Sequence, residues 1–130
     1  MPGFTKEEYI QYRIGKSWST FKDARTLADA QSWNSSVNRL YYTCFYAVLA
    51  LFSKNDISSH SHSGVKTMLS LKFIKAGLLE KELGMLYSDL FDFRQKGDYG
   101  DFFDFDENTV LPLFPQVERF VKEIEELLKK

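Results

Sequence analysis

The sequence predicts an all-α protein, an up-and-down antiparallel bundle of four to five helices built by one domain over residues 1–130. Apolar residues recur every three or four positions through most of the chain, which is the spacing of a buried helix face. No segment shows a convincing strand pattern. A hydrophobic content of 44% and an aromatic content of 16% suffice for one packed core and argue against disorder.

The first helix is expected after Thr5, whose hydroxyl can cap it while Glu8 reaches back. Gly15 interrupts this helix at a modest cost of about 1 kcal/mol relative to alanine. The polar segment 31–36 ends it and starts the next helix. The buried face is predicted to carry these residues: Tyr9, Tyr12, Trp18, Phe21, Ala24, Leu27 and Ala28.

The second helix is expected over about residues 35–53 and is apolar on nearly every side, which is typical of a central helix. Thr43, Ala47 and Ala50 form a strip of small residues that permits a close helix approach. Cys44 lies inside this apolar run, and as the lone cysteine it has no intrachain disulfide partner. A reducing compartment is therefore expected.

After a polar link over 55–63, a third helix is expected over about 64–75, closing on Gly77 in a left-handed conformation. A fourth helix is expected over about 79–96, with Gly97 ending it. The last helix runs from about 107 to the end of the chain.

The last helix has Asp106 as its candidate N-cap, while Pro112 and Pro115 are awkward inside it. This helix therefore either kinks or starts properly only near Pro112. The segment 98–106 alternates acids with aromatics and is predicted to be a packed loop. Its acids are expected to form a solvated edge, because they lack the glycine and terminal glutamate of a calcium loop: Asp98, Asp101, Asp104 and Asp106.

The net charge of −1 hides an asymmetry between the two halves of the chain. Residues 1–75 carry ten Lys and Arg against five Asp and Glu, and residues 76–130 carry seven against thirteen. Two readings stay open. Oppositely charged surfaces help the halves or subunits to pack, or a basic face binds phosphates. That face would consist of Arg13, Lys16, Lys22, Arg25 and Arg39.

The start of the chain has no basic segment followed by an apolar stretch, and the longest apolar run, residues 40–52, is shorter than the roughly 20 residues that span a bilayer. We therefore expect a cytoplasmic protein without a membrane association. Several aromatics are candidates for an interface, although core burial explains them equally well: Tyr41, Tyr46, Phe52, Phe102 and Phe103.

Four blocks of the sequence resemble the HEPN domain family in order and spacing. They begin at Ser35 (SSVNRLYYTCFYAVLAL), His62 (HSGV), Phe73 (FIKAGLL) and Leu90 (LFDFRQKGDY). Together they are similar to the small stand-alone HEPN proteins of bacteria and archaea, over roughly residues 8–127. The resemblance implies a helical bundle, usually dimeric. It also implies a minimal nucleotidyltransferase as partner, and several branches are ribonucleases of toxin–antitoxin or defence systems.

The ribonuclease branches of that family carry an Arg followed, four to six residues later, by a His. Here Arg94 matches the Arg, position 99 is Tyr, and no His follows. Tyrosine, with an ordinary pKa of about 10, is a poor general base for a 2′-hydroxyl. Arg94 alone can still anchor a phosphate or stabilise an oxyanion. The resemblance also offers Tyr99 as a residue that a partner nucleotidyltransferase modifies.

Arg94, Asp98 and Tyr99 lie at one helix end, and two interpretations of them stay open. In one, Arg94 pairs with Asp98 and Tyr99 bonds to the backbone, which locks the turn. In the other, Arg94 faces a phosphate while Tyr99 stacks or hydrogen-bonds. In a symmetric dimer two such clusters would share one cleft.

Asn38, Arg39 and Tyr42 occupy the first turns of the second helix. They form either a buried polar network, with Arg39 paired to one of three aspartates, or part of the Arg94 cleft. The candidate aspartates are Asp89, Asp92 and Asp98.

His60 and His62 flank Ser61, but no further ligand supports a metal site, and we expect neither a metal nor a cofactor. His62 is expected to cap the third helix or to bond to the backbone, and it is also within possible reach of a ligand.

Three functions follow from these residues. The first is a dimeric HEPN-type module that binds a nucleotide, RNA or a nucleotidyltransferase partner without strong catalysis. The second is a ribonuclease toxin that uses Arg94 and Tyr99. The third is a structural dimeric scaffold, whose sign would be Arg94 and Tyr99 buried with all donors satisfied.

Overall fold

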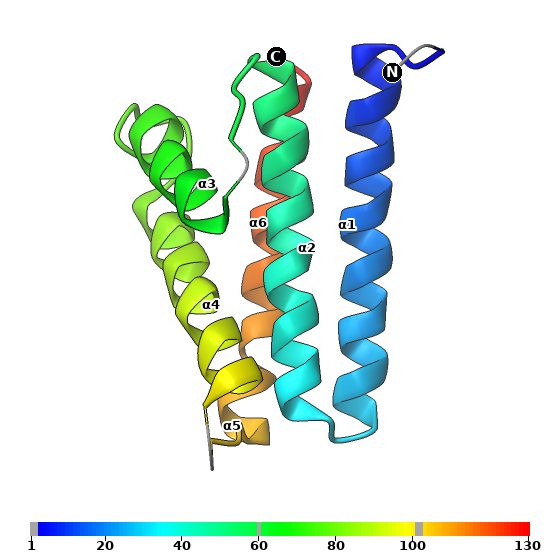
Figure 1. Cartoon of the computed structure of the whole chain (residues 1–130), viewed down its shortest axis with the longest axis vertical. Helices are drawn as coiled ribbons and strands as arrows, with labels where there is room; N and C mark the ends of the chain where they lie inside the picture. The colour runs from blue at the N-terminus through cyan, green and yellow to red at the C-terminus, as the bar shows by residue number, and fades with distance from the viewer. Residues whose placement is uncertain (1–2, 60, 101–102) are drawn as a thin grey trace.

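The computed structural model of the chain describes residues 3–59, 61–100 and 103–130, and Figure 1 shows its arrangement. Over these ranges it is helical and contains no strand. The elements are α1 (Lys6–Asp29), α2 (Trp33–Lys54), α3 (His62–Leu69), η1 (Ser70–Ile74), α4 (Lys81–Tyr99), α5 (Glu107–Val110) and α6 (Leu113–Leu128). The four long helices α1, α2, α4 and α6 alternate in direction along the long axis (Figure 1). The predicted up-and-down bundle is confirmed.

The start of α1 is fixed by the predicted capping box. The Thr5 hydroxyl accepts from the Glu8 N–H at 3.0 Å, and the Glu8 carboxylate accepts from the Thr5 N–H at 3.2 Å. After α1 ends, Gln31 takes a positive φ of 60° and turns the chain into α2. The two helices then lie side by side and antiparallel (Figure 1).

The close approach of α1 and α2 depends on small residues, as the strip in the second helix predicts. Ala24 and Ala47 are fully buried. The Ser17 hydroxyl donates to the Thr43 carbonyl at 2.6 Å, and the Ser36 hydroxyl donates to the Ala24 carbonyl at 2.9 Å. These bonds satisfy hydroxyls that the dry interface would otherwise leave unpaired.

The central helix is α2, as its apolar surface predicts. It contacts α1, α4, α5 and α6. Leu40, Cys44 and Val48 are fully buried along it, and Phe114, Phe120 and Ile124 of α6 are also buried in the core. Cys44 is the free thiol at the middle of this core. Burial of this apolar surface is the main driving force for folding.

The third helix differs from its expected form. α3 covers only His62–Leu69 and continues as a π-helical segment, η1, whose Lys75 N–H donates to the Ser70 carbonyl at 2.9 Å. Gly77 then takes a φ of 78°, so the left-handed ending predicted for it is confirmed.

The prediction that Gly97 ends the fourth helix is wrong, because α4 continues through it to Tyr99. A Cβ at Gly97 would lie 3.1 Å from the Phe105 ring. This glycine therefore serves a close approach between α4 and the following loop. The loop itself is tied to α2 by Asn34, whose side chain accepts from the Phe105 N–H at 2.8 Å and donates to the Phe103 carbonyl at 3.0 Å.

The end of the chain forms two helices rather than one. Asp106 caps α5 by accepting from the Thr109 N–H at 2.9 Å, as expected. The long helix α6 starts only after Pro112, which was one of the two alternatives. Pro115 then lies in the first turn of α6, where a missing N–H leaves no helical bond unmade.

Candidate functional site

The candidate site lies where α2, α3 and α4 meet, and we call it the Arg94 cluster. α2 contributes Asn38, Arg39, Tyr41 and Tyr42, the first residue of α3 is His62, and α4 contributes Arg94 and Asp98. The contacts below join five of the predicted site residues across α2 and α4, and His62 of α3 is linked to them through Tyr41.

Arg94 is half-buried against two tyrosines. Its Nη1 donates to the Tyr42 hydroxyl at 3.3 Å, and its guanidinium carbon lies 5.1 Å from the centre of the Tyr41 ring. No carboxylate lies within ion-pair distance of Arg94 in the part of the chain that the structure describes. Its Nε is buried and has no hydrogen-bond partner there. A guanidinium in this state retains donors for an oxyanion.

Asp98 does not pair with Arg94, so that predicted ion pair is wrong. Asp98 instead accepts from the Asn38 side-chain amide at 2.9 Å. The Asn38 carbonyl oxygen in turn accepts from Nε and Nη2 of Arg39, at 3.0 and 2.7 Å. The geometry of α2 decides this arrangement, because Asn38 reaches across to α4 while Arg94 packs on the tyrosines.

Arg39 forms no ion pair with Asp89, Asp92 or Asp98, so this expectation is also wrong. Its guanidinium lies 5.0 Å from the centre of the Tyr42 ring and is half-buried. Both arginines of the cluster therefore pack on Tyr42, and neither is neutralised by a carboxylate of the described residues.

His62 does not cap α3. The cap is Ser61, whose hydroxyl accepts from the Gly64 N–H at 2.9 Å. The imidazole instead shares a hydrogen bond of 2.8 Å between its Nδ1 and the Tyr41 hydroxyl. His60 lies outside the described residues.

The electrostatics of the cluster keep His62 neutral. Burial of the imidazole, with the positive charge of Arg94 adding to it, lowers the pKa of His62 below its ordinary value of 6.5. Burial also raises the pKa of Tyr41 to about 12, although the neighbouring Tyr87 hydroxyl and, after it, the charge of Arg94 oppose this shift. At neutral pH the cluster thus combines two cations, a neutral imidazole and a protonated phenol. Such a set can bind an anion and can also exchange a proton with it.

Tyr99 is the predicted site residue that the structure does not place in these contacts. It is the last residue of α4 and is 77% exposed. Among the described residues, no hydrogen bond or ring contact joins Tyr99 to the Arg94 cluster.

Tyr41 is the residue of the cluster that sequence reasoning missed. The sequence offered it as an interface or a core aromatic; it is fully buried, and its hydroxyl also holds His62. The signal was indirect, because a tyrosine inside an apolar helix needs a partner for its hydroxyl. Phe52 is likewise buried, whereas Tyr46 is half-buried and Phe103 is 38% exposed; Phe102 lies outside the described residues.

The structure shows where the residues of the predicted acidic edge and of the predicted basic face lie. Asp104 and Asp106 are exposed, as expected of a solvated edge, while Asp101 lies outside the described residues. The five cations of the expected basic face do not all lie together in the structure. Arg13 and Lys16 lie near Tyr46, whereas Arg25 stacks over Phe114 of α6 at 4.1 Å.

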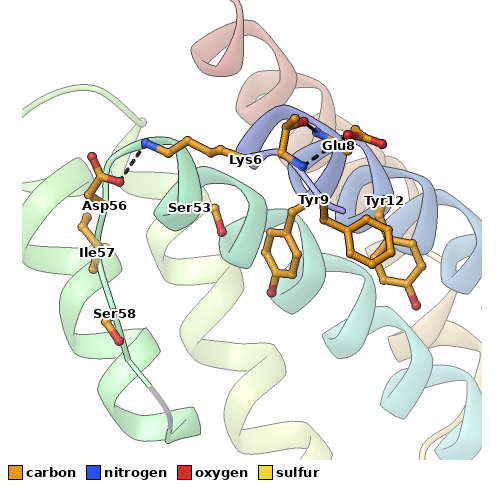
Figure 2. Close-up of a pocket in the computed structure, with 10 residues that line it drawn as sticks. Lys6, Glu8, Tyr9, Tyr12, Ser53, Asp56, Ile57 and Ser58 are labelled. Atoms are coloured by element: carbon orange, nitrogen blue, oxygen red, sulfur yellow. Dashed lines mark hydrogen bonds and ion pairs between the residues drawn. The ribbon is translucent and has the colours of Figure 1, made fainter. Parts of the chain in front are cut away.

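A cavity lies elsewhere, where the start of α1 meets the end of α2 and its following link (Figure 2). Its volume is about 880 Å³. Lys6 and Asp56 close one side of it with an ion pair of 2.7 Å, and Tyr9 and Tyr12 line the other (Figure 2). The sequence signal was the tyrosine pair three residues apart, which we had placed on the buried face. Tyr9 is 38% and Tyr12 60% exposed, so that assignment is wrong for both.

Within the described ranges, no group of three or more His, Cys, Asp or Glu side chains is arranged to hold a metal ion. No helix there is both long and apolar enough to cross a membrane.

Comparison with known proteins identifies the fold family. The HEPN domain family model matches residues 10–127. A UPF0332 protein of Thermotoga maritima is 36% identical over 124 residues, covering 95% of this chain and 94% of that protein. Two Methanocaldococcus jannaschii proteins carry toxin names. "Putative toxin MJ0142" is 33% identical over 90 residues, 69% of this chain and 61% of that protein. "Putative toxin MJ0605" is 27% identical over 123 residues, 95% of this chain and 91% of that protein. The family match over most of the chain and the helical bundle agree, and the chain belongs to the HEPN domain family.

Proposed function

We propose that this HEPN protein is a single-domain binding module whose Arg94 cluster takes a phosphate group of a nucleotide or RNA. The observation that carries the proposal is the half-buried Arg94 guanidinium, which has no carboxylate partner and a buried Nε without any hydrogen-bond partner among the described residues. A buried donor left unpaired destabilises the folded protein. A phosphate that reaches the half-buried guanidinium would accept charge-assisted hydrogen bonds from it.

The neighbours of Arg94 support the same role. Arg39 adds a second cation, and Asn38 holds Asp98 so that this carboxylate does not neutralise Arg94. The structural-scaffold alternative required Arg94 and Tyr99 to be buried with all donors satisfied. Neither condition holds, because the Arg94 Nε is unpaired and Tyr99 is 77% exposed.

Binding of phosphate ligands to the wild type and to Arg94→Gln tests the proposal. The wild type should bind a nucleoside monophosphate and a short RNA at low ionic strength, measured by calorimetry and fluorescence anisotropy. Loss of charged hydrogen bonds should weaken binding by about tenfold or more in Arg94→Gln. Arg119→Gln, at an exposed arginine outside the cluster, is the matched control. Equal binding by wild type and Arg94→Gln would refute the proposal.

A second candidate function, metal-independent RNA cleavage, is favoured by the position of His62. In the tautomer whose Nδ1 carries the proton and donates it to the Tyr41 hydroxyl, Nε2 has no partner among the described residues and can accept a proton. The proton of the 2′-hydroxyl would move to Nε2 while that oxygen attacks the adjacent phosphorus. The P–O5′ bond then breaks, leaving a 2′,3′-cyclic phosphate and a 5′-oxygen that takes a proton from water. Arg94 would stabilise the charge on the phosphorane oxygens.

This second candidate replaces Tyr99 by His62 as the proton acceptor. It agrees with the toxin names of two relatives, which belong to those proteins. Growth arrest on expression of the wild type, relieved in both His62→Asn and Arg94→Ala, would support it, together with cyclic phosphate ends on the cleaved RNA. Equal growth of all three strains would exclude it.

We also propose a homodimer and a nucleotidyltransferase partner, on the strength of the family. Exposed Tyr99 is the residue such a partner would modify. Its phenolic oxygen would attack the α-phosphorus of a nucleoside triphosphate, with loss of the phenolic proton and release of pyrophosphate. Mass spectrometry after co-expression should find one added nucleotide in the wild type and none in Tyr99→Phe. An unchanged mass of the wild type would remove this proposal.

A further inference from the structure

A continuous row of tyrosines and cations leads away from the Arg94 cluster across α2 to α1. We call it the aromatic–cation strip. From one end to the other it consists of Arg94, Arg39, Tyr42, Tyr46, Lys16, Arg13 and Tyr9. The Tyr42 and Tyr46 rings lie 5.9 Å apart, one helical turn from each other on α2. They connect the cations of α4 and α2 with those of α1.

The α1 end of the strip is built in the same way as the Arg94 end. The guanidinium of Arg13 and the ammonium of Lys16 each lie 5.8 Å from the centre of the Tyr46 ring. Nε of Arg13 donates to the Tyr9 hydroxyl at 2.9 Å, and its guanidinium lies 5.0 Å from that ring. Each arginine thus rests on a tyrosine rather than on a carboxylate.

The strip concentrates cations that have no acidic partner. In the described ranges, ion pairs engage Lys6, Arg119, Lys122 and Lys129, whereas none engages a cation of the strip. The carboxylate of the Arg94 cluster, Asp98, is held by Asn38. The strip is therefore a local positive track on a nearly neutral protein.

Its length exceeds one nucleotide. Seven residues of α2 separate Arg39 from Tyr46, a distance of about 10 Å along the helix. This span is longer than the spacing of two neighbouring phosphates in a single strand, so the strip extends beyond one nucleotide. At the far end, Tyr9 also lines the cavity of about 880 Å³, and Figure 2 shows Tyr9 and Tyr12 projecting from the same side of α1.

We infer that the aromatic–cation strip binds a single-stranded RNA of several nucleotides that has one phosphate at Arg94, with its bases against Tyr42 and Tyr46 and further phosphates at Lys16 and Arg13. The inference rests on the proposed function, because Arg94 anchors the strand. Alternation of aromatic rings and cations is the arrangement by which proteins hold single strands, whose bases are free to stack. In a duplex the bases already stack on each other, and a mononucleotide reaches only one end of the strip.

The length dependence of RNA binding tests this inference. Fluorescein-labelled oligouridylates of 2, 4, 8 and 12 nucleotides are titrated into the full chain, beside a 12-base-pair RNA duplex. Affinity should rise with length beyond two nucleotides and should be weaker for the duplex. Arg13→Ala and Tyr46→Ala should each weaken the 12-mer by about fivefold or more, which is the scale of one lost stacked base. Arg13→Ala should leave the affinity for the dinucleotide unchanged, because the single phosphate of the dinucleotide lies at Arg94.

Arg25→Ala is the matched control, since it removes an arginine that also lies on α1 and over aromatic rings, but on the side that faces α6. It should bind the 12-mer as the wild type does. Circular dichroism establishes that each variant is folded, and Tyr46→Leu, which keeps apolar volume, replaces Tyr46→Ala if that variant is not.

The failure of this inference and that of the proposed function are distinguishable. If Arg94→Gln loses binding while Arg13→Ala and Tyr46→Ala bind the 12-mer like the wild type, the strip is refuted and the phosphate site stands. If neither RNA of any length nor a mononucleotide binds, both the strip and the proposed function are refuted. Equal binding of the duplex, or displacement of the 12-mer by octaglutamate at equal concentration, would also overturn the strip, the latter in favour of an acidic protein partner.

Discussion

The two arginines of the C-terminal half of the chain have opposite surroundings. Arg119 on α6 meets Glu80 at 2.7 Å and Glu82 at 3.8 Å. Its hydrogen bond to Glu80 raises the pKa of Arg119 and, from the other side, lowers the pKa of Glu80. Arg94 on α4 has a tyrosine hydroxyl at 3.3 Å, and its buried Nε has no partner among the described residues.

The difference separates the folding role of Arg119 from the binding role that we propose for Arg94. Arg119 is exposed and satisfied within the protein, so an incoming anion would have to compete with two carboxylates. Arg94 is partly desolvated and retains unused donors, which is unfavourable for the fold alone. Groups of this second kind tend to lie at functional sites, where stability is exchanged for activity.

The largest expected effect is the change in affinity for a nucleoside monophosphate when lysine replaces each of these two arginines in turn. Arg94→Lys keeps the charge but loses the planar fork of donors, so affinity for a nucleoside monophosphate should fall about tenfold. Arg119→Lys should leave that affinity unchanged. Calorimetric titrations of both variants provide the measurement. If both lysines bind equally well, the fork at position 94 is not what holds the phosphate.

A smaller effect should separate two buried tyrosines beside Arg94. Tyr41 bonds His62 at 2.8 Å, whereas the Tyr87 hydroxyl is buried without a hydrogen-bond partner among the described residues. Tyr41→Phe should therefore lower the free energy of unfolding by about 1 kcal/mol. Tyr87→Phe should leave it unchanged or raise it. Urea denaturation measures both, and a greater loss in Tyr87→Phe would contradict the assignment.

The smallest effect concerns His62 and pH. Because the folded protein lowers the pKa of His62 below the ordinary 6.5, the unfolded chain binds the proton more tightly. The contribution of His62 to stability is thus fully present above pH 6.5 and declines as pH falls below it. Between pH 7 and 5 the wild type should lose more unfolding free energy than His62→Gln, which lacks the titrating group. Equal losses of unfolding free energy in the two proteins would show that the His62 imidazole is solvated in the folded protein.

The fold was largely predictable from the sequence because its signals are local. The Thr5 capping box, the Asp106 cap and the left-handed Gly77 each depend on neighbours within a few residues. The predicted end of the fourth helix at Gly97 was wrong because the role of this glycine is not local. It depends on Phe105 of the following loop, whose ring packs against it.

Apart from Tyr41 and Tyr99, the membership of the Arg94 cluster was predictable, but the pairing of its side chains was not. Asn38, Tyr42, Arg94 and Asp98 do come together, yet the aspartate four residues from Arg94 bonds to Asn38 of another helix. Which partner an arginine finds depends on how α2 and α4 are rotated against each other, and helix periodicity does not determine that. The link between Tyr41 and His62, 21 positions apart, is a tertiary contact of the same kind.

The single buried thiol makes opening of the helical bundle measurable. Cys44 is fully buried at the middle of α2, and burial raises its pKa. A thiol reagent reaches it only when the surrounding helices separate, because the reactive thiolate does not form in a dry core. The labelling rate at one native atom therefore counts opening events of the whole bundle, without an added probe.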